Sequence, residues 1–171
     1  SGDELVKQME TRETPIDSKA DLLMRLTNKK GKTRFSLLRS FVKDDGKKQI
    51  IWFLSPADDK GIAFLKIEHA NKDDEMHIWL PAFKKIKRIS SKKKSDSFMG
   101  SDMSYEDMST RKRGDYDFNI IGLESYNDVK CHLLKSIPKN HVRSEYAMHQ
   151  TWIDSSLLIP LKENSYDKNG K

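Results

Sequence analysis

The chain has 171 residues, which is long enough for one domain with a buried core. Hydrophobic residues make up 36% and charged residues 34%, a balance that excludes a disordered chain, and a net charge of +6 is too weak a bias to predict a nucleic-acid-binding protein. The single cysteine, Cys131, excludes an internal disulfide, and no apolar run approaches the ~18 residues that cross a bilayer as a helix.

The first half of the chain predicts one helix followed by several strands. Leu5, Val6 and Met9 recur at helical spacing ahead of Pro15, which indicates a short amphipathic helix over about residues 3–12. From residue 32 the apolar spacing changes to two, and turn sequences such as KDDGK separate the segments. The expected strands cover residues 32–42, 49–56, 62–69 and 76–81.

The second half continues the pattern after a break at residues 92–108. Four further strands are expected over residues 115–126, 129–138, 146–154 and 156–166, with Gly122 marking a bulge or bend and residues 167–170 forming a turn. We therefore expect eight or nine strands, with at least seven in one antiparallel sheet that curves around an apolar interior. A sheet of this length tends to curl and to close partly into a barrel.

The sequence contains no arrangement typical of an active site. The five histidines lack zinc-site spacing, and neither a nucleotide-binding loop nor a serine-hydrolase motif is present. Cys131 and His132 are adjacent on an expected strand, so their side chains should point to opposite faces and cannot act as a pair. The acidic residues around Glu106 match no EF-hand loop and are interpreted as a solvated turn. We predict a protein that is not an enzyme and that has no cofactor and no metal site.

A basic run lies between two of the expected strands. It comprises Lys84, Lys85, Lys87, Arg88, Lys92, Lys93 and Lys94. One interpretation is a solvated edge strand, where lysines prevent edge-to-edge pairing. The second is contact with anionic lipid headgroups or an acidic partner, and the third is nucleic acid, which the scarcity of aromatic residues disfavours. We keep the headgroup or partner contact as a site prediction, with peripheral contact to a membrane, and predict no nucleic-acid partner.

Residues 76–108 carry a motif that resembles a known family. In MHIWLPAFKKIKRISSKKKSDSFMGSDMSYEDM, Leu80, Pro81 and residues 87–89 match the first part of the signature of the outer-membrane lipoprotein-sorting proteins, which are LolA-like. Residues 97–102 and 104–107 match the second part. The sequence departs from the pattern at Met103, where the family has phenylalanine, and at Met108, where it has leucine. The resemblance points to the subgroup associated with RND-type exporters.

The resemblance implies a mainly β fold, in which a curved antiparallel sheet forms an incomplete, LolA-like β-barrel with short covering helices. Residues 1–171 would then be a single LolA-like domain that lacks its C-terminal strands. The resemblance also implies a periplasmic location, and because Ser1 and Gly2 resemble a remnant of cleavage, we expect that an export signal was removed.

The implied function is that of a periplasmic carrier. Such a protein binds acyl chains of a lipoprotein or lipid in an apolar half-barrel cavity, for transfer toward the outer membrane. The alternative is a non-catalytic interaction module, or an accessory subunit of an RND-type inner-membrane exporter, that holds no cargo. A large continuous apolar pocket would favour the carrier, and a filled barrel with an exposed apolar patch would favour the module.

Strand alternation supplies the candidates for the cavity lining. These are Phe35, Leu37, Phe53, Phe64, Met76, Ile78 and Leu80. The unusual stretch over residues 95–108 is interpreted as a cover that lies over the barrel mouth with four side chains inward, namely Phe98, Met99, Met103 and Tyr105. The other interpretation is that these side chains plug the core permanently.

Overall fold

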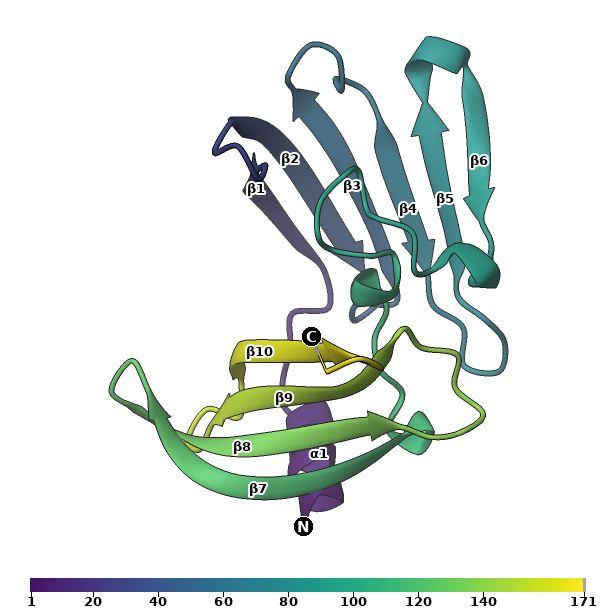
Figure 1. The fold of residues 1–171 in the computed structure, drawn as a ribbon. Helices are drawn as coiled ribbons and strands as arrows, with labels where there is room; N and C mark the ends of the chain where they lie inside the picture. The colour runs from purple at the N-terminus through teal and green to yellow at the C-terminus, as the bar shows by residue number, and fades with distance from the viewer. Residues whose placement is uncertain (171) are drawn as a thin grey trace. The chain divides into compact units, whose positions relative to one another are not determined.

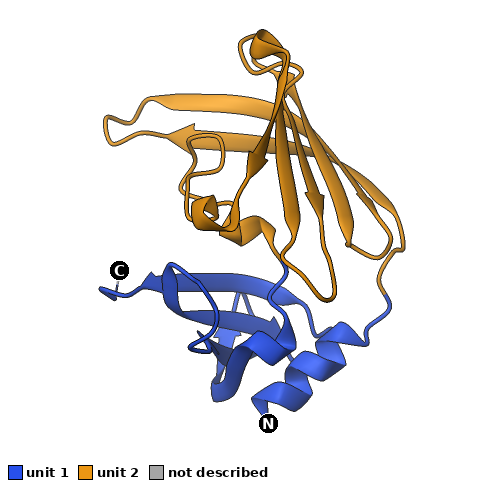
Figure 2. Ribbon diagram, turned by 90° about the vertical axis from the view of Figure 1, so that its right-hand side faces the viewer, with its two compact units in different colours: residues 1–13, 110–171 blue, residues 14–109 orange. Residues whose placement is uncertain are grey.

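A computed structural model describes residues 1–170 and places them in two compact units (Figure 2). Residues 14–109 form one unit, and residues 1–13 together with 110–170 form the other. Each unit has its own antiparallel sheet, so the expectation of one sheet with at least seven strands is wrong. The expectation that residues 1–171 form a single LolA-like domain that lacks its C-terminal strands stays a prediction.

The unit of residues 14–109 contains a six-stranded meander. Its strands follow chain order across the sheet: β1 Ser18–Thr27, β2 Thr33–Lys43, β3 Lys48–Ser55, β4 Ala63–Ile67, β5 Glu75–Leu80 and β6 Lys85–Ile89 (Figure 1). Short turns connect successive strands, so each strand pairs antiparallel with the next. In the β2–β3 turn Asp44 and Asp45 have φ values of 55° and 56°, a left-handed conformation that aspartate tolerates. Two strands, β1 and β6, were not among those expected from the apolar spacing, although an edge strand was one interpretation of the basic run that β6 contains.

The second unit contains a four-stranded sheet in the order β10-β9-β8-β7 and the single α-helix. Its elements are α1 Gly2–Glu10, β7 Tyr116–Tyr126, β8 Val129–Pro138, β9 Tyr146–Asp154 and β10 Pro160–Asp167. A register shift between Ile120 and Gly122 is the bulge that Gly122 predicted. Four short 3-10 helices, one in this unit and three in the other, complete the chain: η1 Pro81–Phe83, η2 Ser91–Lys93, η3 Glu106–Met108 and η4 Arg113–Asp115.

The helix α1 packs on one face of the four-stranded sheet. Ser1 caps it through a hydrogen bond from the Glu4 amide to Ser1 Oγ at 3.3 Å, and Leu5 is buried against Phe118 and Ile153. Gly2 lies so close to β7 that a Cβ there would stand 2.3 Å from the Phe118 carbonyl oxygen. The helix therefore begins where only glycine fits. The opposite face of this sheet has a separate small core around Cys131, Leu133 and Trp152.

A polar network lies on the face of the four-stranded sheet that the helix covers, since Thr151 pairs with the buried Leu134 of that face. Arg111 forms an ion pair with Glu163, which also accepts a hydrogen bond from Thr151 Oγ1 at 2.7 Å, and His149 Nδ1 lies 2.8 Å from Ser165 Oγ. Burial raises the pKa of Glu163, but the hydrogen bond and charge of Arg111, with Thr151, outweigh burial and hold that pKa below its usual value.

This network predicts an acid-dependent loss of stability. Because folding lowers the Glu163 pKa, its contribution is complete above the pKa of the unfolded chain and is lost as the pH falls through the folded value. We expect the melting temperature of the wild type to fall more steeply than that of Glu163→Gln below about pH 4.5, the ordinary value of this carboxyl. Parallel melting curves for the two proteins between pH 6 and pH 3, by circular dichroism, would contradict the assignment.

Candidate functional site

One face of the six-stranded sheet carries the largest apolar cluster of its unit. We call this the covered face; its buried members are Leu38, Ile51, Phe53, Phe64, Met76, Ile78 and Ile89. The strand register brings them together, because Leu38 pairs with Phe53, Ile51 with Phe64, and Phe64 with Ile78. Cross-strand partners project from the same face, so alternate residues of five strands build one apolar surface.

The segment of residues 95–108, here called the cover segment, lies over this face. In Figure 1 the teal-green loop that follows β6 passes in front of β3 and β4, the strands whose Phe53 and Phe64 its Phe98 ring contacts. A bridge pairs Ser97 with Ser104, and the Phe98 amide donates to the Met103 carbonyl at 2.7 Å. The Tyr105 amide donates to the Asp96 carbonyl at 3.1 Å. These bonds close a miniature hairpin whose turn contains Met99 and Gly100, both at positive φ.

Aromatic rings join the cover segment to the sheet. The Phe98 ring centroid lies 5.3 Å from that of Phe64 and 5.7 Å from that of Tyr105, both in edge-to-face geometry, and 6.4 Å from that of Phe53. Phe98 is 3% exposed and Tyr105 is 7% exposed. Burial, and to a lesser extent the charge of Asp96, raises the pKa of the Tyr105 hydroxyl. Each such ring pair adds about 0.5–1.5 kcal/mol beyond its buried area, so the segment is held chiefly by its side chains.

Five of the seven predicted lining residues lie on the covered face. Phe53, Phe64, Met76 and Ile78 are buried there, and Leu80 packs half-buried at its margin. Whether they contact cargo stays a prediction. The covered face also includes residues that the sequence did not single out, among them Leu38, Ile51 and Ile89.

The placement of Phe35 and Leu37 on this face is wrong. Both side chains are exposed, at 52% and 39%, because the buried positions of β2 are Ser36, Leu38 and Ser40. The strand carries large apolar residues at both parities, and the serines occupy the side that the cover segment approaches. Alternation alone selected the wrong parity for this strand.

The inward assignment of the cover segment holds for three of its four residues. Phe98 and Tyr105 are buried, and Met99 packs half-buried against the same cluster, as does Met108. Met103 is 48% exposed, so its inward placement is wrong. Met103 directly precedes the bridged and buried Ser104, and its side chain therefore turns to solvent as the hairpin closes.

Polar groups also lie on the covered face. Lys66 is 6% exposed and its Nζ lies 2.6 Å from Glu68 Oε1, while the Gln49 side-chain amide donates to Ser40 Oγ at 3.1 Å. Ser36 Oγ is buried without a hydrogen-bond partner among the described residues. No local pattern predicted the burial of these groups, because each belongs to a strand whose other residues are largely apolar.

The basic run falls on the edge of the sheet. β6 pairs only with β5, and Lys85, Lys87 and Arg88 are exposed on it. Lys84 occupies the turn before β6 with φ 48°, and Lys92 and Lys93 belong to the exposed η2. This placement agrees with a solvated edge strand, and contact with headgroups or a partner stays a prediction.

Residues 1–170 hold no group of three or more metal-ligating side chains, and no helix among them is long and apolar enough to cross a membrane.

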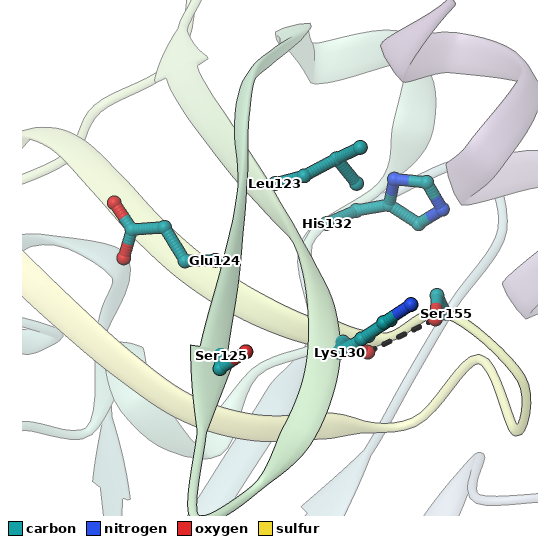
Figure 3. Close-up of a pocket in the computed structure, with 6 residues that line it drawn as sticks. All are labelled: Leu123, Glu124, Ser125, Lys130, His132 and Ser155. Carbon is teal, nitrogen blue, oxygen red and sulfur yellow. Dashed lines mark hydrogen bonds between the residues drawn. The ribbon is translucent and has the colours of Figure 1, made fainter.

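A shallow hollow of about 470 Å³ opens beside the β7–β8 hairpin in the second unit (Figure 3). Its lining mixes Leu123 and His132 with Glu124, Ser125, Lys130 and Ser155. None of the predicted lining residues belongs to this hollow, and its mixed lining does not resemble an acyl cavity.

The sequence and the fold were compared with those of known proteins. Residues 45–171 match a family described only as an uncharacterized protein, and no curated protein matches the sequence. The crystal structure of a DUF1329 family protein from Desulfovibrio piger superposes with a TM-score of 0.90 at 30% identity, over 99% of this chain and 74% of that one. A domain from Vibrio parahaemolyticus, described as an outer membrane lipoprotein-sorting protein, gives 0.86 at 35% identity, over 99% and 73%.

A more distant match bears on the fold alone. A LolA superfamily protein from Nitrosomonas europaea superposes with a TM-score of 0.69 at 18% identity, over 99% of this chain and 73% of that one. Together with the open antiparallel sheets and the single α-helix, these matches confirm the expected fold class, which is mainly β and LolA-like.

Proposed function

This chain belongs to the family of DUF1329 and outer-membrane lipoprotein-sorting proteins, and from that membership we propose that it is a non-catalytic periplasmic carrier. It binds acyl chains of a lipoprotein or lipid on the covered face, in the place that the rings of the cover segment occupy, for transfer toward the outer membrane. The observation that carries this proposal is the attachment of residues 95–108 to an apolar sheet face through Phe98 and Tyr105.

The hydrogen bonds of the cover segment support an opening motion. The Glu106 amide donates to the Lys94 carbonyl at 2.7 Å, and the Phe98 and Tyr105 amides also find acceptors within the segment. These bonds can stay intact when the hairpin lifts as one piece, so opening costs chiefly the ring contacts with the sheet. An acyl chain that fills the vacated place recovers about 0.8 kcal/mol for each methylene it buries.

Methionines surround the site of the proposed exchange. Met76 is buried in the covered face, and Met24, Met99 and Met108 pack against its edge. Their unbranched side chains can repack around rings or around acyl chains at low cost. This adaptability suits a carrier that must hold its cargo and release it.

Native mass spectrometry tests the carrier proposal. Protein purified from a diderm host should show, beside the bare chain, a species heavier by one lipid or acylated peptide, and denaturing conditions should release that mass. If no bound species appears in any preparation, and none appears after incubation with a long-chain lysophospholipid, the carrier proposal is wrong.

Hydrogen exchange supplies a second prediction for the same site. The amides of residues 95–108 should exchange faster than those of β3 and β4, because a lifting hairpin exposes its own amides more often than central strands do. Palmitate should slow exchange in the segment, whereas octanoate at the same concentration should not, since a short chain buries too little surface. Equal protection of the segment and the strands, unchanged by palmitate, would mean a permanent plug.

The alternative of an interaction module keeps support from two observations: the filled covered face, and apolar side chains that the same unit exposes to solvent, such as Leu23 and Ile86. The covered face is filled by Phe98 and Tyr105, as expected for a protein that holds no cargo. In that case the chain would act through its surface, for example as an accessory subunit of an RND-type exporter, a partner that rests on the sequence resemblance alone. The lipid-binding measurements above separate the two functions.

A further inference from the structure

The face of the six-stranded sheet opposite the covered face is broadly apolar. We call it the open face and define it by two rows of cross-strand partners. One row crosses β2 to β6 through Arg39, Trp52, Ala63, Trp79 and Ile86. The next crosses β1 to β6 through Lys19, Phe41, Ile50, Leu65, His77 and Arg88. Leu23 and Leu37 pair beside the first row, and Phe35 pairs with Arg25 beyond them.

Large apolar side chains of the open face meet solvent. Leu23 is 68% exposed and Ile86 is 69% exposed, while Trp52 and Trp79 keep more than a third of their surface open. The two tryptophans flank the small, buried Ala63, and Phe41 meets Trp52 edge to face with centroids 5.6 Å apart. Soluble monomers rarely expose a contiguous patch of this kind unless it binds something. The core of this unit lies on the other face, so packing of the unit does not explain the open face.

Cations surround and interleave these apolar residues. The rows of the open face and the neighbouring β-strand ends carry six cations, Lys19, Arg25, Arg39, Lys43, Lys48 and Arg88, of which Lys48 forms an ion pair with Asp44 in the β2–β3 turn. The same rows and strand ends carry two carboxylates, Asp21 and Glu75. Both carboxylates are paired: Asp21 accepts from Arg39 at 2.6 and 2.8 Å, and Glu75 accepts from Lys72 at 2.7 Å. The Lys19 ammonium lies 5.7 Å from the centroid of the Phe41 ring. The face is therefore apolar at its centre and cationic around it.

We propose that the open face docks on the surface of an anionic phospholipid bilayer. Tryptophan prefers the level of the headgroups, where its apolar ring and its N–H are both accommodated, and lysine and arginine beside it attract anionic headgroups. A second copy of the chain is a poorer occupant, because a symmetric contact would set the same cations opposite one another. The proposal is independent of the carrier function, since either a carrier or a module could dock in this way.

The β5–β6 hairpin is the part of the open face that enters the bilayer most deeply. Trp79 and Ile86 pair across the two strands, and Phe83 at the hairpin tip is 70% exposed. Lys84 follows Phe83 in the tight turn and places a cation beside these apolar groups. This tip combines bulky apolar side chains with a cation at an edge of the sheet, an arrangement suited to the boundary between headgroups and acyl chains.

Vesicle flotation tests the proposal with the whole chain. The vesicles contain equal parts of phosphatidylglycerol and phosphatidylcholine, with pure phosphatidylcholine for comparison. We expect binding to the anionic vesicles, and a loss of about tenfold or more in the variant Trp79→Ser with Ile86→Ser, because two large apolar side chains are removed from the interface. The matched control is Leu123→Ser, a 72% exposed leucine in the other unit, which should leave binding within about twofold. Raising the salt concentration from about 0.1 M to about 1 M should weaken the binding of the wild type to the anionic vesicles, because salt screens the attraction between the cations and the headgroups.

Tryptophan fluorescence gives a readout that needs no variant. Two of the three tryptophans lie on the open face, while Trp152 is 9% exposed in the other unit, with its indole N–H bonded to Glu124 at 2.8 Å. Anionic vesicles should therefore reduce the quenching of wild-type fluorescence by iodide. Unchanged quenching, or full vesicle binding by the double variant, would overturn the proposal.

Two other outcomes would also overturn it. Loss of binding only when Lys92, Lys93 and Lys94 are changed to glutamine would assign membrane contact to the basic run alone. A concentration-dependent dimer that the double variant disperses, with no vesicle binding, would assign the open face to a second copy. Cargo binding is measured separately by native mass spectrometry, so failure of membrane docking and failure of the carrier proposal can be told apart.

Discussion

Replacing Phe64 with alanine should lower the free energy of unfolding by about 3–5 kcal/mol, the usual cost of truncating a fully buried phenylalanine. Phe64 is 0% exposed and its ring meets those of Phe98 and Tyr105, so its loss leaves a cavity between the sheet and the cover segment. Urea denaturation followed by circular dichroism measures the change. A loss below about 1 kcal/mol would mean that the cover segment does not pack on this face in solution.

The matched control for Phe64→Ala is Phe35→Ala. Both are phenylalanines on strands of the same sheet, but Phe35 is 52% exposed on the open face. Its truncation should cost less than about 1 kcal/mol. A cost equal to that of Phe64→Ala would return Phe35 to the interior, as strand alternation had placed it.

The comparison between Phe35 and Phe64 shows how far alternation alone could reach. Period-two spacing located eight of the ten strands, and an edge strand at β6 was one interpretation of the basic run. The spacing assigned the faces of β4 and β5 correctly, because only one parity of β5 is apolar throughout. In β2 the same rule chose Phe35 and Leu37, since they are larger than the serines between them. The buried positions are Ser36 and Ser40, and their small size leaves space on the side that the cover segment approaches.

Other features depended on contacts that no local pattern shows. The strand β1 was missed because its sequence, SKADLLMRLT, does not alternate: Leu22 and Leu23 are consecutive and point to opposite faces. Almost all of its residues are exposed, so no buried face marks it as a strand. The division into two sheets depends on which strands pair across residues 90–115, and antiparallel spacing is the same in either case. The family signature at residues 97–107 marked the cover segment, but only the structure shows that Phe98 and Tyr105 are its anchors.

The two faces of the six-stranded sheet would have complementary roles in the proposed carrier. The covered face is apolar and closed by a segment with its own hydrogen bonds, while the open face is apolar and bordered by cations. A protein that moves acyl chains between membranes needs a sheltered apolar surface for its cargo. It also gains from a surface that pauses at a bilayer, since transfer is faster when the carrier is held near the lipid.

Changing Phe98 to aspartate should abolish most lipid uptake while lowering stability less than the same change at Phe64. The charge at position 98 can reach water if the cover segment lifts, because its hairpin bonds are internal, whereas a charge at position 64 stays buried in a central strand. In the proposed complex the segment contacts the acyl chain, and the Phe98→Asp change would present a charge to it in place of an apolar ring. We therefore expect uptake of a fluorescent long-chain lipid to fall about tenfold or more, the equivalent of about two buried methylenes. Melting temperature and lipid uptake are measured on the same preparations of both variants.

The control for this comparison is Met103→Asp, in the same segment but 48% exposed, which should leave both uptake and melting temperature nearly unchanged. A permanent plug predicts the reverse order for Phe98→Asp, because the charge would then be trapped among Phe53, Phe64 and Tyr105. The melting temperature would fall as far as in Phe64→Asp, and the molecules that remain folded would take up no less lipid than the wild type. That result would exclude residues 95–108 as a movable cover and would leave the interaction module as the function that the filled sheet supports.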